Sequence, residues 1–559
     1  MTTTTVYRAR KIITLEPGQP EATHVAVREG RILAVGDLAR CAAWGAYTLD
    51  ERFADKVLMP GLVEGHCHLK EGSMWEWTYL GWFDRRDPDG KVWPGLRSMD
   101  AVVARLAEVS ARMDAEGQGA SAPLIAWGFD PIYFGGERMT VEHLDRASAV
   151  RPIIIAHANG HLMNVNTAML RSAEITRHTG ADGEVEGVVK FAEGHARAGE
   201  PTGELQEPAA MFLVLRKIGN AGLLAPMTEA GVRSFARLAC RQGVTTATDL
   251  VNKLAEDDVR VLEAALSDDA VSIRILPAFQ AFHGTHAAQA GAEHVKTLMA
   301  RNTDRLRYGL VKMMLDGSIQ GFSARLRWPG HYNGAPNGIW VMAPAQYEAD
   351  FETYHRAGLL VHTHTNGDEA SEVAIDAIGR VLARAPRPDH RHTLQHGQMI
   401  DGPLFGRMAT LGLCANLFAN HLWYWGDQHY EMTMGPDRAM RLDACGSALA
   451  AGVPLAIHSD APVTPLGPLF TAWCAVNRVT PKGRVLGEAE KLTVQQALHA
   501  ITLGPAYTLK LDHEIGSIAC GKRADFCVLE DDPLAVDPMA LKDIPVWGTV
   551  LSGRVFPAP

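Results

Sequence analysis

The 559-residue sequence predicts an α/β fold: a (β/α)8 TIM barrel, a small β-sandwich domain built from both termini, and a subdomain inserted after the first barrel strand. From Gly243 onward, amphipathic stretches alternate with short apolar runs, and several of these runs follow a glycine that can end a helix. With the apolar stretch at 58–65, there are eight such runs. Eight buried parallel strands that alternate with helices are typical of this barrel.

Both ends of the chain have strand patterns. Alternating apolar residues at 24–28 and 31–36 flank the turn pair Glu29-Gly30, and similar patterns occur at 524–529 and 546–556. Neither end has enough strands to bury an apolar face alone. We therefore expect the two ends to fold together into one small domain, with the middle of the chain inserted between its halves.

The barrel strands follow in order along the middle of the chain. They are predicted at 58–65, 244–249, 271–278, 308–315, 359–364, 392–396, 413–416 and 453–460. The alternative is an open doubly wound sheet, which is disfavoured because no Gly-x-Gly-x-x-Gly turn follows a strand.

The gap after the first strand is far longer than a barrel crossover needs, and it contains strand-like runs at 123–127 and 151–157. We expect an inserted subdomain that leans over the mouth of the barrel. The predicted boundaries are 1–60 and 507–559 for the sandwich, 61–506 for the barrel, and about 70–232 for the insertion.

Composition narrows the possible partners. The net charge of −10 comes from 64 acidic and 54 basic residues without long runs, which argues against nucleic-acid and anionic-membrane partners. The eight cysteines form no C-x-x-C pair, the N-terminus lacks a signal-peptide apolar segment, and no apolar run is long enough to span a bilayer. We expect a cytoplasmic homo-oligomer, a dimer, that acts on a small-molecule substrate.

Polar residues stand at the ends of the predicted barrel strands. His66 and His68 are one residue apart in an extended segment, so their side chains point to the same face. The other strand-end residues of this kind are Lys312, His364, His396 and Asp460. Buried imidazoles and carboxylates must be paired or metal-bound, because an unpaired one costs several kcal/mol. The pattern therefore predicts a divalent metal site at the carboxyl ends of the strands.

Three further histidines precede these strand ends by an even number of positions. They are His362, His392 and His458, and strand alternation places them on the same face but deeper. We interpret them as core histidines or as groups that support the ligands, rather than as ligands.

Six motifs resemble those of the amidohydrolase superfamily, and within it the YtcJ-like, Amidohydro_3 group that includes N-substituted formamide deformylases. The resemblance runs from about Val6 to Phe556, with the motifs in the same order. The matching segments are 60–68 (P-G-[FL]-[VI]-D-x-H-x-H), 311–318 (V-K-x-x-x-D-G-S), 364–368 (H-A-I-G-D), 394–398 (I-E-H-A-Q), 459–463 (S-D-A-P-V) and 516–526 (G-S-I-x-x-G-K-x-A-D-[LF]). His458 departs from the glycine that is usual before Ser-Asp in this group.

The resemblance implies a binuclear metal centre, with zinc expected and manganese, iron and nickel left open. By this resemblance, His66, His68 and Asp460 hold one metal, and His364 and His396 hold the second. Metals this close share a hydroxide of lowered pKa, which attacks a carbonyl carbon. Asp460 then acts as general base and afterwards as general acid.

Lys312 can join such a site only as a carboxylated lysine (a carbamate), because a protonated ammonium has no lone pair and repels the metals. The resemblance implies that the two carbamate oxygens bridge the metals. The alternative is an unmodified lysine, paired with Asp316 or Asp460 beside a single metal.

Residues in the loops are predicted to contact the substrate. Asn159-Gly160-His161 resembles the D-G-H of the group, and Asn420-His421 resembles its N-H, so His161, Asn420 and His421 are candidate substrate-binding residues. Trp423 is a fourth candidate. Its aromatic cluster, 423–425, and a second cluster at 75–83 form either an apolar substrate wall or internal packing.

The sequence therefore predicts a metal-dependent amidohydrolase that cleaves a C–N bond of an amide, N-formyl or related small substrate. The first alternative is a mononuclear deaminase of the same superfamily, which needs a glutamate proton shuttle in H-x-x-E. Here Gly367 occupies that position, and Glu369 comes two residues later. The second alternative is a non-enzymatic, metal-stabilised binding or regulatory protein, against which the presence of Asp460 argues.

Overall fold

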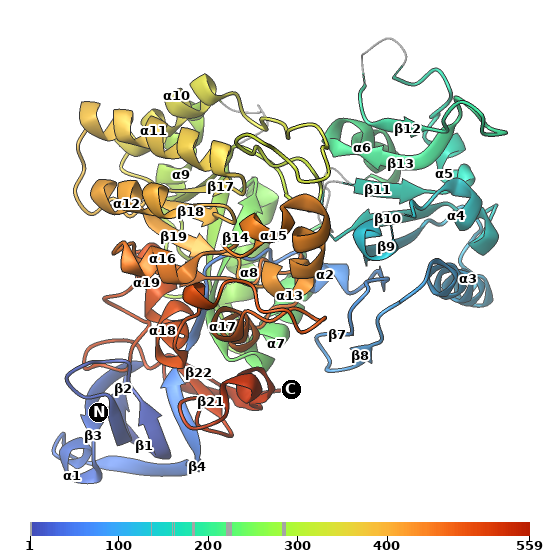
Figure 1. Ribbon diagram of the computed structural model, residues 1–559. Helices are drawn as coiled ribbons and strands as arrows, with labels where there is room; N and C mark the ends of the chain where they lie inside the picture. The colour runs from blue at the N-terminus through green and yellow to red at the C-terminus, as the bar shows by residue number, and fades with distance from the viewer. Residues whose placement is uncertain are drawn as a thin grey trace. The chain divides into compact units, whose positions relative to one another are not determined.

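The computed structural model describes residues 3–135, 137–158, 160, 162–180, 185–219, 226–281 and 287–559. The chain divides into two compact units, one formed by Met1–His68 with Ala236–Pro559 and the other by Leu69–Phe235 (Figure 1). Within the described residues, no helix has the length and apolar character needed to cross a membrane.

Strands from both ends of the chain share one sheet in the first unit. Its described strands have the order β23-β22-β21-β4-β1-β2-β3. They are β1 (Thr4–Ile13), β2 (Glu21–Arg28), β3 (Arg31–Gly36), β4 (Tyr47–Pro60), β21 (Phe526–Leu529), β22 (Val546–Leu551) and β23 (Arg554–Pro557). The blue and red strands therefore lie together in Figure 1. We refer to them as the terminal sheet.

The long strand β4 joins the two halves of the terminal sheet. It pairs in parallel with β1 and antiparallel with β21, where Phe526 lies opposite Pro60. The strands of the predicted sandwich are consequently hydrogen-bonded in one continuous sheet. The turn between β2 and β3 has Glu29 at φ 53° and Gly30 at φ 73°, the conformation that tight hairpins require. One face is covered by a core that includes Ile12, Phe53 and Phe526.

A second sheet in the same unit carries the predicted strand-end residues. In the described chain it has eight strands, all parallel, in the order β20-β19-β18-β17-β16-β15-β14-β5. They are β5 (Leu62–Glu64), β14 (Val244–Asn252), β15 (Arg274–Gln280), β16 (Leu310–Met314), β17 (Leu360–Thr365), β18 (Thr393–His396), β19 (Cys414–Leu417) and β20 (Leu455–Ile457). Each overlaps a predicted barrel strand. Just beyond the two edge strands, Cys67 and Ala461 form a parallel bridge, so the sheet is barrel-like.

Helices lie between these parallel strands or follow the last of them, as in the predicted βα pattern. They include α8 (Glu256–Ser267), α9 (Ala288–Met299), α10 (Pro344–Arg356), α11 (Asp368–Arg384), α12 (Gly402–Leu411), α16 (Cys445–Ala450), α17 (Pro468–Asn477), α18 (Val494–Ala500) and α19 (Leu503–Thr508). Helices α9, α10, α11 and α12 pack in succession beside the strands (Figure 1). Gly412 at the end of α12 has φ 70°, which confirms a predicted glycine C-cap.

Shorter helices fill the connections of this unit. They are α1 (Leu38–Ala42), α13 (His421–Tyr424), α14 (Gly426–Gln428) and α15 (Gly435–Ala439), whereas α7 (Glu229–Arg241) crosses the boundary between the units.

The unit Leu69–Phe235 has its own sheet and its own apolar cores. Its six described strands have the order β12-β13-β11-β10-β9-β6. They are β6 (Thr78–Tyr79), β9 (Leu124–Phe129), β10 (Ile153–His157), β11 (Leu162–Val165), β12 (Val188–Lys190) and β13 (Pro201–Gln206). Strands β7 (Arg85–Arg86) and β8 (Val92–Trp93) pair separately, and the helices are α2 (Glu71–Met74), α3 (Met99–Ala115), α4 (Val141–Ala147), α5 (Thr167–Ser172) and α6 (Glu207–Leu215). The expected position of this unit at the barrel mouth stays a prediction.

Candidate metal centre

The segments that follow β5 and β20 are hydrogen-bonded to each other. The backbone N–H of His68 donates to the carbonyl of Ala461 at 2.7 Å, and the N–H of Asp460 donates to the carbonyl of His66 at 3.1 Å. These two bonds bring the predicted ligands of the first strand beside the predicted ligand of the eighth.

The Asp460 carboxylate lies among imidazole rings. Its Oδ1 atom is 3.1 Å from His68 Nε2 and 3.3 Å from His66 Nε2, while its Oδ2 atom is 3.7 Å from His396 Nδ1. All four side chains are buried. Asp460 and His396 have φ 52° and 66°, a region that non-glycine residues seldom adopt and that is enriched at functional sites.

Two overlapping groups of described side chains have the spacing of metal ligands. The first is His66, His68 and Asp460, and the second is His66, His396 and His458. In each group, one possible ligand atom from each residue, a ring nitrogen or a carboxylate oxygen, lies within 4.8 Å of the others. The first group consists entirely of predicted ligands, whereas the second adds His458, which the sequence placed outside the ligand set. His458 stands two positions before Asp460, and this even spacing is the feature of the sequence that places the two side chains on the same face.

His364 adjoins these groups through His396. The two ring centroids are 4.4 Å apart. His364 Nε2 lies 3.1 Å from the carbonyl oxygen of Gly317 and 3.7 Å from Asp316 Oδ1. The structure therefore brings His364 to the cluster without placing it in either three-residue group.

Lys312 is buried on β16, with a side chain that is almost fully enclosed. Its Nζ atom has no hydrogen-bond partner among the described residues. Burial lowers the Lys312 pKa to about 7, and the lysine in turn helps to lower the His66 pKa. Asp316 accepts hydrogen bonds from the backbone N–H groups of residues 325, 366 and 367, and among the described residues no ion pair joins it to this lysine.

Burial sets the protonation states of the cluster. It lowers the pKa of His66, His396 and His458 well below 6.5, so their rings are neutral and keep a lone pair for a metal. Burial also raises the pKa of Glu64 to about 8. Glu64 accepts a 2.8 Å hydrogen bond from the hydroxyl of Ser459, the residue directly before Asp460.

These residues fit a divalent cation. The donor set of imidazole nitrogens and a carboxylate suits zinc and its neighbours. Lys312 Nζ is a buried polar atom without a hydrogen-bond partner in the described chain, and such an atom is costly unless another group satisfies it.

The residues predicted to contact the substrate lie in different kinds of surroundings. Asn420 donates to the Thr464 hydroxyl at 2.8 Å, and His421 lies 3.4 Å from Asp443 Oδ1, so both residues are buried in polar networks. Trp423 packs edge-on against Trp473 at 5.2 Å, which favours the packing interpretation of its cluster. His161 and Asn159 lie outside the described residues.

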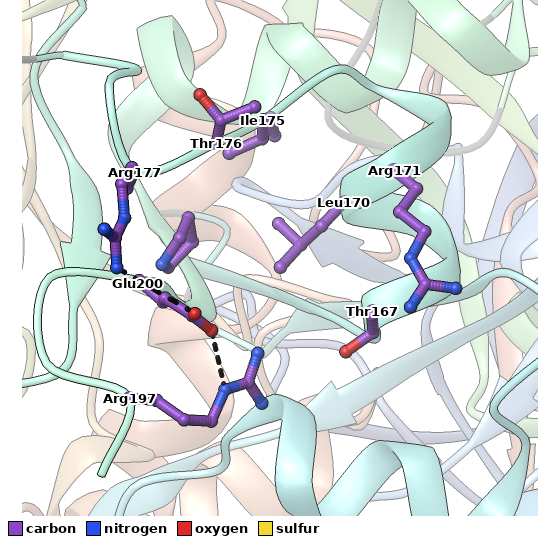
Figure 2. Close-up of a pocket in the computed structure, with 9 residues that line it drawn as sticks. Thr167, Leu170, Arg171, Ile175, Thr176, Arg177, Arg197 and Glu200 are labelled. Carbon is purple, nitrogen blue, oxygen red and sulfur yellow. Dashed lines mark hydrogen bonds and ion pairs between the residues drawn. The ribbon is translucent and has the colours of Figure 1, made fainter. Parts of the chain in front are cut away.

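The unit Leu69–Phe235 contains a separate cavity of about 210 Å³ (Figure 2). Its lining residues are Thr167, Leu170, Arg171, Ile175, Thr176, Arg177, Arg197, Glu200 and Pro201. Glu200 forms ion pairs with Arg197 at 2.9 Å and with Arg177 at 4.0 Å. Since its lining residues include no histidine or cysteine, this cavity is not a candidate metal centre.

Comparison with known families and proteins gives matches along most of the chain. The model of the amidohydrolase family matches residues 54–557. Protein LONG AFTER FAR-RED 3 of Arabidopsis thaliana is 27% identical over 533 residues, covering 93% of this chain and 85% of that protein. The putative amidohydrolase YtcJ of Bacillus subtilis is 26% identical and covers 89% of this chain and 88% of its own.

The N-substituted formamide deformylase of Arthrobacter pascens is 25% identical and covers 95% of this chain and 94% of its own. Among solved structures, an uncharacterized metal-dependent hydrolase from Pyrococcus horikoshii OT3 superposes with a TM-score of 0.70. It is 20% identical and covers 96% of this chain and 99% of that chain, so it supports the fold alone. The resemblance predicted from the motifs is confirmed by these matches.

Proposed function

The chain belongs to the amidohydrolase family of metal-dependent hydrolases, and from that premise we propose that it hydrolyses a C–N bond in an amide, N-formyl or related small substrate. The observation that carries this proposal is the Asp460 carboxylate, which lies within 3.1–3.7 Å of three imidazoles in the described cluster. Such a set of imidazoles around a carboxylate matches the donor set of a catalytic metal site.

The proposed ligands come from the motif resemblance, and the grouping of His66, His68 and Asp460 supports them in part. His66, His68 and Asp460 would hold one divalent ion, His364 and His396 would hold a second, and a carboxylated Lys312 would be a ligand as well. We propose zinc, with manganese, iron or nickel as alternatives. A bound divalent ion of this kind lowers the pKa of a water molecule and polarises a carbonyl oxygen.

Asp460 is the proposed proton carrier. Its carboxylate faces the centre of the cluster, so it can accept the proton of an attacking water molecule. The same oxygen atom then donates this proton to the nitrogen that leaves. The similarity to N-substituted formamide deformylase supports a C–N bond as the target.

The two alternatives are less well supported. A deaminase needs a glutamate that faces the centre, whereas Glu369 accepts a 2.9 Å hydrogen bond from Arg325 and a 3.0 Å bond from Asn337. A non-enzymatic binding or regulatory protein does not need a carboxylate beside four histidines. The small-molecule substrate, the dimeric state and the cytoplasmic location remain proposals.

The function can be tested on the purified protein. Metal content is measured first, and hydrolysis of amides, formamides, carbamates and esters is then assayed before and after chelation and after metal is restored. We expect turnover that disappears with the metal and returns with it. Asp460→Asn should lower kcat by about 10²–10⁴-fold, the usual contribution of a general acid–base. A metal-loaded protein without metal-dependent hydrolysis across the panel would contradict the proposal.

A further inference from the structure

A network of buried polar side chains lies beneath the metal centre and fixes which imidazole nitrogens carry hydrogen. We infer that His458 supplies a further nitrogen ligand to this centre, and that Gln395 and Asn416 are positioning residues that direct the bare nitrogens of His66 and His458 toward the metal. The inference rests on the proposed metal-dependent function. The added ligand, His458, stands directly before Ser459-Asp460, where glycine is usual in the group that the sequence resembles.

The network starts at a backbone carbonyl. His362 Nε2 lies 3.3 Å from the carbonyl oxygen of Thr508, and because this oxygen can only accept, Nε2 carries the hydrogen. His362 is fully buried, and no described carboxylate forms an ion pair with it, so the ring is neutral. Its Nδ1 atom is therefore bare and accepts a hydrogen bond from Gln395 Nε2 at 2.7 Å.

This bond fixes the orientation of the Gln395 amide. Since its nitrogen donates to His362, its oxygen faces the other way, where it accepts from His66 Nδ1 at 2.8 Å and from Asn416 Nδ2 at 2.9 Å. His66 Nδ1 therefore carries the hydrogen. The bare nitrogen of His66 is Nε2, the atom that lies 3.3 Å from Asp460 Oδ1.

The same logic continues through Asn416 to His458. The amide nitrogen of Asn416 donates to Gln395. The amide oxygen of Asn416 therefore faces His458 Nδ1 at 3.1 Å and accepts a hydrogen bond from this nitrogen. His458 Nε2 is therefore bare. It accepts a hydrogen bond from His396 Nδ1 at 3.1 Å, within the group that His66, His396 and His458 form.

The geometry of His458 is that of a ligand rather than of a core residue. Its ring stacks on the His66 ring at 4.6 Å with an interplanar angle of 16°, so both rings approach the cluster from the same side. The Nδ1 atom of His458 donates its hydrogen bond to Asn416. The lone pair of the Nε2 atom therefore points toward the other ligands. Support of an imidazole by a hydrogen bond at its second nitrogen is the usual arrangement around a metal.

The ligand role can be tested with cobalt-loaded protein. X-ray absorption counts the imidazoles per metal, and visible absorption reports the coordination of Co²⁺. His458→Gln should lower the imidazole count and change the cobalt bands, whereas His355→Gln, a matched change at a buried histidine outside this network, should keep the count. An unchanged count in the His458 variant overturns the ligand assignment, even if the affinity for cobalt falls.

The positioning role is tested separately by cobalt affinity. Gln395→Met removes the acceptor of His66 Nδ1 and should weaken cobalt binding by about 10–100-fold. Gln395→Glu keeps an acceptor there and should restore most of the affinity. Gln398→Met is the matched control, because Gln398 is also buried but donates to His429 at 2.9 Å. Equal affinities of the two methionine variants would overturn this role.

These outcomes separate the inference from the proposed function. A wild-type protein that binds neither cobalt nor zinc would contradict the proposed function itself. A wild-type protein that binds metal and hydrolyses amides, with both variant series unaffected, would contradict the inference alone. Circular dichroism and thermal unfolding of each variant confirm that it is folded.

Discussion

Arg274 and Asp525 form an ion pair of 2.7 Å with side chains that are only 1% and 3% exposed. Arg274 is the first residue of β15 in the barrel-like sheet, and Asp525 directly precedes β21 of the terminal sheet. The second carboxylate oxygen of Asp525 accepts from the N–H of Ser552 at 2.7 Å, and Arg274 also donates to the Thr246 hydroxyl at 2.9 Å. This pair therefore links the two sheets of the first unit.

Removing one partner of this pair should destabilise the protein. Asp525→Ala leaves the Arg274 guanidinium buried without its counterion, which costs about 3–5 kcal/mol in the free energy of unfolding. Denaturant unfolding monitored by circular dichroism measures this loss. Glu51→Ala breaks the exposed Arg8–Glu51 pair and serves as the control, with an expected loss below about 1 kcal/mol. Equal effects of both variants would contradict the prediction.

Removing His66 should empty the metal centre. His66 belongs to both groups of candidate ligands, so His66→Ala should weaken metal binding by more than about 100-fold, whereas the loss of a supporting partner usually costs about 10–100-fold. Elemental analysis after dialysis gives the metal content. The control is His513→Ala, whose side chain is largely exposed. If His66→Ala kept both metal and activity, the site assignment would be wrong.

Lys312 should react with carbon dioxide. Because burial lowers its pKa to about 7, a large share of the amine is neutral at neutral pH, and the neutral amine is the form that attacks carbon dioxide to give a carbamate and a proton. Protein supplied with ¹³C-bicarbonate should show a carbamate carbon signal by NMR, and Lys312→Arg should lack it. Lys482→Arg, a change at an exposed lysine, should retain the signal. A wild-type spectrum without it would favour the unmodified lysine.

Glu64 should make stability fall as the pH rises. Burial raises its pKa in the folded state to about 8 from the usual 4.5, so the folded protein favours the protonated form. The stability that this form contributes is fully present below pH 4.5 and is lost as the pH rises through about 8. Glu64→Gln carries no charge and keeps the shape of the side chain. It should match the wild type at acidic pH and exceed its melting temperature at pH 9.

The measurement is the difference in melting temperature between the variant and the wild type from pH 4 to pH 9. Glu488→Gln alters an exposed glutamate and should show no such trend. A difference that stays constant across this range would show that Glu64 is not protonated in the folded protein.

Much of the fold could be predicted from local sequence patterns. Buried parallel strands need continuous apolar runs, so segments such as 275–278 and Leu455–Ile457 are recognisable without any knowledge of their partners. The terminal sheet was harder to predict because β4 carries charged residues at 50–52 and extends well before the apolar stretch that ends it. Strand β4 pairs with both β1 and β21, and local sequence patterns do not indicate a pairing between segments so far apart in the chain.

The candidate site could be predicted less completely. Side-chain alternation holds within a strand, and His364 lies on β17, whereas His66 and His68 lie in the segment that follows β5. It fails where the backbone leaves the strand, and Asp460 has a positive φ at that point. His458, which alternation placed below the ligands, consequently lies among them. The contacts of Trp423 depend on helix α17, which no local pattern indicates.

The double pairing of β4 has a consequence for synthesis on the ribosome. The barrel strands emerge before β21, so the C-terminal part of β4 presents unpaired backbone groups until translation is almost complete. A nascent chain in this state carries an open strand edge that can pair with another chain. Products that end between residues 461 and 525 should therefore aggregate even though every strand of the barrel-like sheet is present.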